Sequence, residues 1–390
     1  PRPASQRAAA FILTAAMLIT LAAPAFAETW YIENGDITVK AGETGNDVTQ
    51  NNVTTKNDTD TIITNQKTDT ASSNTVTIDA ENDKVEVKLD NVNIKADSGS
   101  ALTSKGDVTL ALNGDNHLTG GISGTGNYGR NGIASTGSLT ISGGENDSLT
   151  AQGGSGADGS YGGHGIYSNG SLTISGGTVN ATGGDGSNVN GSGISSNGSV
   201  TISGGTVTAN GGNGGNVSGD GIRSDGGVTI SGGTVKAAGG DGSDGGSGIS
   251  SSSGVTVSDG TVTANGGNGG NVSGDGIRSD GGVTISGGTV KAAGGNGGKV
   301  GGYGICSFDR VTISGNTVNA AGGNGGKVGG YGICSFDRVA ISGGTVEAAG
   351  GSSSRNGGSG IYSNDIDLSG SLELTAKAGS PNGKALSQKG

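Results

Sequence analysis

The string YGICSFDRV occurs twice in this chain, at residues 303–311 and 331–339. Each copy contains one of the two cysteines, Cys306 and Cys334, which lie 28 residues apart. A duplicated nonapeptide at this distance indicates a repeat array, so the period of the array is the first guide to the fold.

The motif Gly-Ile-x-Ser, which lies inside this string, marks the period. After a first interval of 33 residues its isoleucines are spaced by 27 or 28 residues, and they are Ile133, Ile166, Ile194, Ile222, Ile249, Ile277, Ile305, Ile333 and Ile361. Leu102 and Leu386 lie in worn copies at the two ends. A longer string, GGNGGNVSGDGIRSDGGVTISGGTVKAAGG, is repeated at 211–240 and 266–295, so the array has grown by copying one or two units.

Within one unit, three short segments alternate apolar and polar residues and end at turn signals. In the unit that starts at Gly221 they span 222–224, 228–231 and 234–237. The alternation places one set inward and one outward: Ile222, Val228, Ile230, Val235 and Ala237 against Arg223, Thr229, Thr234 and Lys236. This pattern predicts an all-β fold, a right-handed parallel β-helix with three short strands and about 28 residues per rung.

Two other architectures fit the composition less well. A β-propeller also repeats short strands, but its blades have about 40 residues and recurring aromatics, whereas only 3% of this chain is aromatic. Helices are opposed by the 87 glycines. The glycine-rich segments between rungs are either ordered turns or mobile loops, and the sequence leaves both open.

Composition and charge divide the chain into three parts. An apolar run followed by Ala25-Phe26-Ala27 predicts a signal peptide at 1–27. Residues 28–97 hold 14 acidic and 6 basic side chains and are interpreted as an acidic N-terminal β cap region, before a β-helix repeat domain at 98–390 with worn terminal rungs. No later run is apolar enough to span a membrane. The net charge of −11 argues against nucleic acid as a partner. Because a signal peptide is predicted, we expect a secreted or cell-surface protein.

The two cysteines are predicted to be neighbours in the β-helix. Each follows an inward isoleucine and should therefore face outward, one rung from its copy. A Cα separation of about 4.8 Å lies within the range of disulfides, but in-register neighbours hold their Cβ atoms farther apart than a bridge prefers. A disulfide between Cys306 and Cys334 and a pair of adjacent free thiols both remain open.

The repeated string also supplies a candidate binding surface for polysaccharide. Sugars are usually recognised by exposed aromatic rings with polar groups alongside, and both copies offer such a set: Tyr303, Phe308, Asp309 and Arg310, then Tyr331, Phe336, Asp337 and Arg338. A doubled set suits a linear polymer. The alternative is that the phenylalanines cover the core at a corner while the Asp-Arg pairs merely face water.

Two stretches resemble exported clostridial β-helix proteins described as carbohydrate-binding domain-containing: DKVEVKLDNVNIKADSGSALTSKGDVTLALNGDNHLTG at 83–120 and GIYSNGSLTISGGTVNATGG at 165–184. The opening ETWYIENGDITV at 28–39 is similar to the mature start of surface proteins in gut Firmicutes. The resemblance implies binding of plant cell-wall polysaccharides and of calcium. The acidic DGIDSNG unit of that group is altered here, because only Asp220 and Asp275 keep its first aspartate and arginine replaces its second.

Calcium is therefore a candidate ligand, although no cofactor is required by this interpretation. GGSGADGSY at 153–161 and GGDGSDGG at 239–246 partly match a calcium-binding nonapeptide. The candidate ligands are Asp158, Asp185, Asp220, Asp241, Asp244 and Asp275. The alternative is that these are solvated turn aspartates.

No catalytic residue is predicted. His164 lies in GGHGIYS at 162–168, a string also found in polygalacturonases, but the clustered aspartates that such enzymes need are missing. His164 fills a variable slot before Gly-Ile, the slot of Ser192 in the next unit. We expect an exported, non-catalytic protein that binds extracellular polysaccharide. A structural spacer or adhesin is the alternative, and a polysaccharide lyase or hydrolase comes third.

Overall fold

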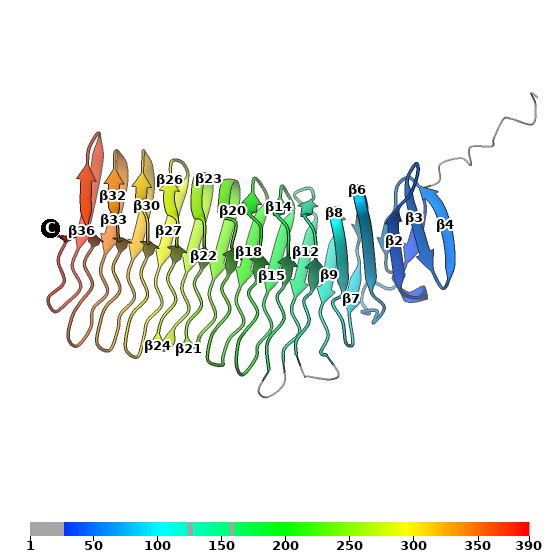
Figure 1. Cartoon of the computed structure of the whole chain (residues 1–390), viewed down its shortest axis with the longest axis horizontal. Helices are drawn as coiled ribbons and strands as arrows, with labels where there is room; N and C mark the ends of the chain where they lie inside the picture. The colour runs from blue at the N-terminus through cyan, green and yellow to red at the C-terminus, as the bar shows by residue number, and fades with distance from the viewer. Residues whose placement is uncertain (1–26, 124–127, 157–159, 390) are drawn as a thin grey trace, which may run out of the picture.

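Each Gly-Ile-x-Ser motif forms a short strand that pairs in parallel and in register with the next copy. The computed structural model describes residues 27–123, 128–156 and 160–389. These residues form an all-β parallel β-solenoid of about 11 turns, consistent with the right-handed parallel β-helix predicted from the sequence (Figure 1). Ile222, Ile249 and Ile277 are direct partners along this ladder, and the prediction of a 28-residue rung is confirmed.

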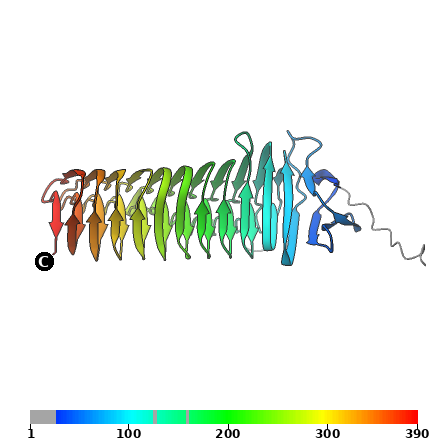
Figure 2. The same ribbon diagram turned by 90° about the horizontal axis from the view of Figure 1, so that it is seen from above.

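Three columns of strands run along the rod. The first column holds the Gly-Ile-x-Ser strands: β10 (Ile133–Ser135), β13 (Ile166–Ser168), β16 (Ile194–Ser196), β19 (Ile222–Ser224), β22 (Ile249–Ser251), β25 (Ile277–Ser279), β28 (Ile305–Ser307), β31 (Ile333–Ser335), β34 (Ile361–Ser363) and β37 (Leu386–Gln388). The second holds β11 (Leu139–Ser142), β14 (Leu172–Ile174), β17 (Val200–Ile202), β26 (Gly282–Ile285), β29 (Val311–Ile313), β32 (Arg338–Ile341) and β35 (Asp365–Leu368). Figure 2 shows such columns from above.

The third column holds β7 (Asn93–Lys95), β9 (Asp115–Thr119), β12 (Ser148–Gln152), β15 (Thr178–Thr182), β18 (Thr206–Asn210), β27 (Thr289–Ala293), β30 (Asn316–Ala321), β33 (Gly344–Ala349) and β36 (Leu372–Lys377). Two longer strands, β20 (Val228–Ala238) and β23 (Gly254–Asn265), run from the second column into the third without a break and pair with neighbours in both. The short strands β21 (Gly242–Asp244) and β24 (Gly269–Val272) pair with each other inside the glycine-rich loops.

The core is a set of aliphatic stacks inside the rod. Ile222, Ile277, Ile305 and Ile333 are fully buried and lie in one column, as the alternation predicted. Burying such a side chain contributes about 1.5–3 kcal/mol. That contribution needs a rung on each side, because a single rung has no interior of its own.

The serine of the motif points inward as well and closes the first corner. Ser196 and Ser224 are buried, and their hydroxyl groups donate to the carbonyl oxygens of Gly170 and Gly198, each at 2.8 Å. These carbonyls belong to the previous rung. The fixed serine therefore links consecutive rungs, a role that the sequence pattern did not reveal.

The glycine-rich loops are ordered in the described residues and lie side by side along one edge of the rod (Figure 1). Gly219 N–H donates to Gly212 O at 3.1 Å within one loop, and Gly212 N–H donates to Gly191 O at 2.8 Å in the previous rung. A Cβ atom on Gly219 would overlap the oxygen of Gly191. Ordered turns are thus the correct alternative for these loops, and close approach of backbones explains their glycines.

The N-terminal part combines antiparallel and parallel pairing. β2 (Ile37–Ala41) and β3 (Asn46–Gln50) are antiparallel, as are β3 and β4 (Val53–Asp58), whereas β2 is parallel to the long β6 (Val76–Asp90). The remaining elements here are β1 (Thr29–Tyr31), η1 (Ile32–Asn34), β5 (Ile62–Thr64) and β8 (Leu102–Asn113). The boundary of the cap region at residue 97 stays a prediction, because the parallel ladder already begins between β2 and β6. Residues 1–26 of the predicted signal peptide lie outside the described residues.

Replacing one loop glycine tests the packing of the loops. Gly219→Ala is expected to lower the free energy of unfolding by about 1–3 kcal/mol, because a methyl group must displace the backbone of the neighbouring rung. Gly270→Ala is the matched control, since the nearest atom to a Cβ there is 3.8 Å away. Equal unfolding midpoints for both variants in chemical denaturation would contradict the packed-loop arrangement.

Candidate functional site

The candidate surface is built around strands β25, β28, β31 and β34. In the outward position of these strands the register joins Arg278 to Cys306, Cys306 to Cys334, and Cys334 to Tyr362. Tyrosine precedes strands β28 and β31, and phenylalanine follows them. The surface therefore has a central column flanked by two columns of aromatic residues.

Three tyrosines form one stack on this surface. The ring centroids of Tyr303 and Tyr331 are 5.3 Å apart with planes 5° from parallel, and those of Tyr331 and Tyr362 are 4.7 Å apart with planes 6° from parallel. Tyr303 and Tyr331 are half-buried. Burial raises the pKa of both phenols, and the nearby Cys334 thiol adds to both shifts. The sequence did not place Tyr362 here, although its position one rung after Cys334 could have done so.

The phenylalanines form a second stack. The centroids of Phe308 and Phe336 are 5.1 Å apart, with planes 23° from parallel. The guanidinium carbon of Arg278 lies 5.3 Å from the centroid of Phe308, on the side of the previous rung. Phe308 is 48% exposed and Phe336 is 42% exposed, so the alternative in which they cover the core is wrong.

The orientation of the rings limits what they can bind. In each stack, neighbouring rings are nearly parallel and their centroids are about 5 Å apart, so part of each ring face is turned toward the neighbouring ring. What they offer to solvent is mainly their edges, the positive rim of the aromatic quadrupole. A sugar lying flat on each ring is not accommodated by this arrangement.

The charged pairs form a third column beside the phenylalanines. Arg310 lies 4.0 Å from Asp337, and Arg338 lies 2.7 Å from Asp365. Each arginine therefore reaches the aspartate of the next rung, and Asp309 begins the column at an exposed position. Exposed ion pairs of this kind contribute only about 0–1 kcal/mol each.

The cysteines occupy outward positions, as predicted, yet both are buried and free. Their neighbours in the column explain the burial: Arg278 and Tyr362 lie on the two outer sides of the thiol pair, and the tyrosine stack lies beside it. A hydrogen bond with Cys334, together with burial, raises the pKa of the Cys306 thiol. Because both thiols are buried, reagents in solution reach neither of them easily in the native state.

Two of the candidate calcium ligands belong to a ladder of hydrogen bonds in the glycine-rich loops. Asp185 Oδ1 accepts the N–H of Asn213 at 2.7 Å, and Asp241 Oδ1 accepts the N–H of Asn268 at 2.6 Å. The whole set, which we call the loop ladder, is Ser155, Asp185, Asn213, Asp241, Asn268, Asn296, Asn324, Ser352 and Ser380. In the structure these carboxylates satisfy backbone donors of the next rung.

A second ladder contains Asp220 and Asp275, in the slot before Gly-Ile. Asp220 Oδ1 accepts the N–H of Ser247, and Asp275 Oδ1 accepts the N–H of Tyr303, each at 2.7 Å. We call this set the entry ladder: Asn131, His164, Ser192, Asp220, Ser247 and Asp275. It ends at Tyr303, because the phenolic oxygen lies at the far end of the ring and cannot reach the next backbone N–H.

His164 is a member of the entry ladder rather than a filler. Its Nδ1 accepts the N–H of Ser192 at 2.9 Å, and its ring lies against Tyr167, with centroids 5.7 Å apart. Burial and then the charge of Arg223 lower the pKa of His164 to about 4, so the ring is neutral and Nδ1 is available as an acceptor at pH 7. From Asn131 to Asp275 the slot varies in residue type, but each of its residues supplies a hydrogen-bond acceptor.

The described residues contain no group of three His, Cys, Asp or Glu side chains able to hold a metal ion. Asp244 is exposed at the tip of a loop, and Asp158 lies outside the described residues. Calcium binding thus stays a prediction.

A small cleft adjoins the tyrosine stack. It has a volume of about 350 Å³ and is lined in part by Asp244, Asp275, Arg278 and Tyr303. Arg278 Nη1 lies 3.8 Å from Asp275 Oδ2, so the same guanidinium borders this cleft and covers Phe308. Arg278 therefore connects the cleft to the phenylalanine stack.

Five segments of the chain match the family model described as Beta helix repeat: residues 172–198, 200–222, 228–253, 283–305 and 339–361. These segments are thus similar in sequence to beta-helix repeats. Comparison with curated proteins and with solved structures gives no match. The beta-helix repeats carry no information on a clostridial origin or a carbohydrate-binding type, so that part of the resemblance stays a prediction.

Beta-helix repeats occur both in enzymes, such as pectate lyases and polygalacturonases, and in proteins that are not enzymes. The fold alone therefore does not decide between binding and catalysis. Within the described residues, no helix has the length and apolar character needed to cross a membrane.

Thiol labelling tests the state of the cysteines. We expect that protein purified without reductant shows two reactive thiols after denaturation and almost none while folded, because Cys306 and Cys334 are free and buried. Arg223→Cys adds an exposed thiol in the same column and should be labelled without denaturant. A count of zero thiols in denatured, unreduced wild-type protein would establish a disulfide instead.

The buried carboxyl of Asp275 gives a pH-dependent stability. Burial raises its pKa to about 6, against the partly opposing effects of the Tyr303 N–H and Arg278, while the charge of Asp220 adds to the rise. Between about pH 4 and pH 6 the folded state therefore holds more protons than the unfolded state, and stability falls as pH rises through this window.

Asp275→Asn keeps an acceptor for Tyr303 but cannot ionise. The unfolding free energy of the variant minus that of the wild type should be about 1–3 kcal/mol larger at pH 7.5 than at pH 4. Denaturation at both pH values measures the gain. Asp280→Asn, at an exposed turn, is the control for loss of one negative charge. A gain that is absent, or that is larger at pH 4, would show that the Asp275 carboxyl is not held in this way.

Proposed function

We propose that this chain is an exported, non-catalytic protein that binds extracellular polysaccharide, either secreted or held at the cell surface. The observation that carries the proposal is the repetition of exposed Phe308 and Phe336 in register, beside the charged pairs of Arg310 and Arg338. A polymer running along the rod meets an aromatic edge, a guanidinium and a carboxylate on each of these two rungs.

The tilt of the rings defines the kind of contact. Aromatic edges carry partial positive charge and favour the hydroxyl oxygens of a sugar, while the arginine and aspartate side chains donate to and accept from its hydroxyl groups. Each contact is weak, so affinity depends on the number of rungs engaged. We expect binding to long polymers rather than to monosaccharides.

Calcium is not needed for a surface of this kind, although the aspartates of the loops keep it as a candidate ligand. Neither the net charge of −11 nor any basic patch of the sequence favours nucleic acid as a partner. The signal sequence predicted at 1–27 supports export.

One observation favours the second candidate, a structural spacer or adhesin without sugar specificity. The tyrosine faces are largely turned toward one another, which stabilises neighbouring rungs and leaves less surface for a ligand. The two functions differ in a simple measurement, because a spacer binds no polysaccharide.

The phenylalanine stack is tested by a double substitution. Phe308→Ala with Phe336→Ala is expected to weaken polysaccharide binding about tenfold, equivalent to about 1.4 kcal/mol, because it removes both exposed rings. Co-sedimentation and affinity electrophoresis against a panel of insoluble and soluble polysaccharides measure the change. Val217→Ala with Val272→Ala is the control, since both valines are about half exposed on other rungs.

Four outcomes separate the alternatives. Retained binding in the phenylalanine variant places the polymer on another face of the rod. Loss of binding in excess EDTA assigns calcium a role. Absence of binding to the whole panel favours the spacer. Shortening of the polymer during incubation indicates a lyase or hydrolase.

A further inference from the structure

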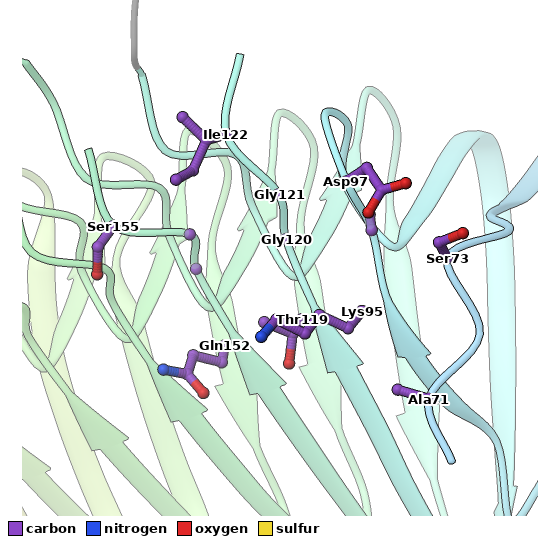
Figure 3. A pocket seen from close by; sticks show the side chains of 13 residues that line it. Ala71, Ser73, Lys95, Asp97, Thr119, Gly120, Gly121, Ile122, Gln152 and Ser155 are labelled. Atoms are coloured by element: carbon purple, nitrogen blue, oxygen red, sulfur yellow. The ribbon is translucent and has the colours of Figure 1, made fainter. Parts of the chain in front are cut away.

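A cleft of about 700 Å³ lies near the N-terminal end of the rod, on the outer side of strands β7, β9 and β12 (Figure 3). Its polar lining includes Ser73, Lys95, Asp97, Thr119 and Gln152, and Ile122 contributes an apolar side chain. The volume is within the usual range of ligand sites, about 300–1,000 Å³. The phenylalanine stack lies many rungs away, so this cleft is independent of it.

One side of the cleft is a row of three side chains on consecutive rungs. Lys95 is in register with Thr119, and Thr119 with Gln152. Figure 3 shows the three close together at the ends of their strands. Successive positions in such a row are about 4.8 Å apart, so the row supplies an ammonium, a hydroxyl and an amide along the axis of the rod.

Asp97 and Ser73 line the cleft apart from this row (Figure 3). The side chains of Lys95, Asp97, Thr119 and Gln152 make no hydrogen bond or ion pair with one another or with any other described residue. In the loop ladder and the entry ladder, by contrast, polar side chains are used by the next rung. These four side chains are therefore available to a ligand.

The rim of the cleft continues into an aromatic pair. Ile122 forms an isolated antiparallel β-bridge with Gly129, which directly follows Tyr128 in the sequence. The ring centroids of Tyr128 and Tyr161 are 5.4 Å apart, and the ring planes are 43° apart. Both tyrosines are almost half exposed. These tilted rings differ from the nearly parallel stacks near the C-terminal end.

We propose that this cleft binds a short segment of a neutral saccharide. Lys95 and Asp97 contribute opposite charges to the lining, so their charges cancel overall and neither an anionic nor a cationic ligand is favoured by the net charge of the cleft. Sugar hydroxyl groups both donate and accept, which matches the mixture of ammonium, carboxylate, hydroxyl and amide around the cleft. The proposal does not depend on polysaccharide binding at the phenylalanine stack.

The test uses the full chain and three neutral probes: a cello-, a xylo- and a manno-oligosaccharide, with an oligogalacturonide as the charged comparison. Calorimetric titration and saturation-transfer NMR measure binding. Thr119→Val with Gln152→Ala is expected to weaken binding of at least one neutral probe tenfold or more. Thr182→Val with Asn210→Ala changes the next two positions of the same column outside the cleft and should leave binding unchanged.

The same titration on the Phe308→Ala, Phe336→Ala variant separates the two sites. Neutral-probe binding that persists there and is lost in the Thr119→Val, Gln152→Ala variant supports the cleft, even if polymer binding at the phenylalanine stack is never found. The proposal is overturned if no neutral probe binds, if the cleft variant binds as wild type, or if the oligogalacturonide binds more tightly than every neutral probe.

Discussion

Everything in this molecule depends on one constraint, the in-register hydrogen bonding of each rung to its copy on the next. Parallel pairing places equivalent residues about 4.8 Å apart, so Ile222 stacks on Ile249 and Cys306 on Cys334. A residue that fits its own rung must therefore also be compatible with the residue at the equivalent position of the next rung, whether this is the same type or another. The sequence of the unit is therefore selected for self-compatibility along the axis as much as for folding within a rung.

Some charged positions show one way in which this constraint is met. In the entry ladder, aspartates alternate with serine, so Asp220 and Asp275 are separated by Ser247. In the third column, Lys236 and Lys291 are separated by Thr263. Like charges directly opposite one another destabilise a sheet, and alternation avoids this cost. The two copies of the string, at 211–240 and 266–295, begin two rungs apart, and this spacing preserves the alternation.

The sequence was sufficient for what repeats within the unit. Period-2 alternation identified the inward aliphatic column of Ile222, and the 28-residue period placed the two cysteines side by side, because both depend only on strand geometry. It could not reveal that Asp185 serves the backbone of the next rung, since a turn aspartate has the same local sequence whether it meets calcium, water or an N–H group. Burial of Cys306 and the place of Tyr362 in the stack were missed for a related reason: both depend on side chains from neighbouring rungs, where the columns change residue type.

Those changes in the columns are the places where function is most strongly indicated. A stabilising ladder needs an acceptor before each Gly-Ile, and Tyr303 gives up that acceptor for an aromatic ring. Lys95 and Gln152 leave polar groups unused where other columns engage them. Positions that break a local rule without a structural gain are expected to be functional sites. Where a column does repeat a residue type, it presents the same group at regular intervals along the rod. Regular intervals suit a polymeric ligand, and this is the physical reason for the binding role that we propose.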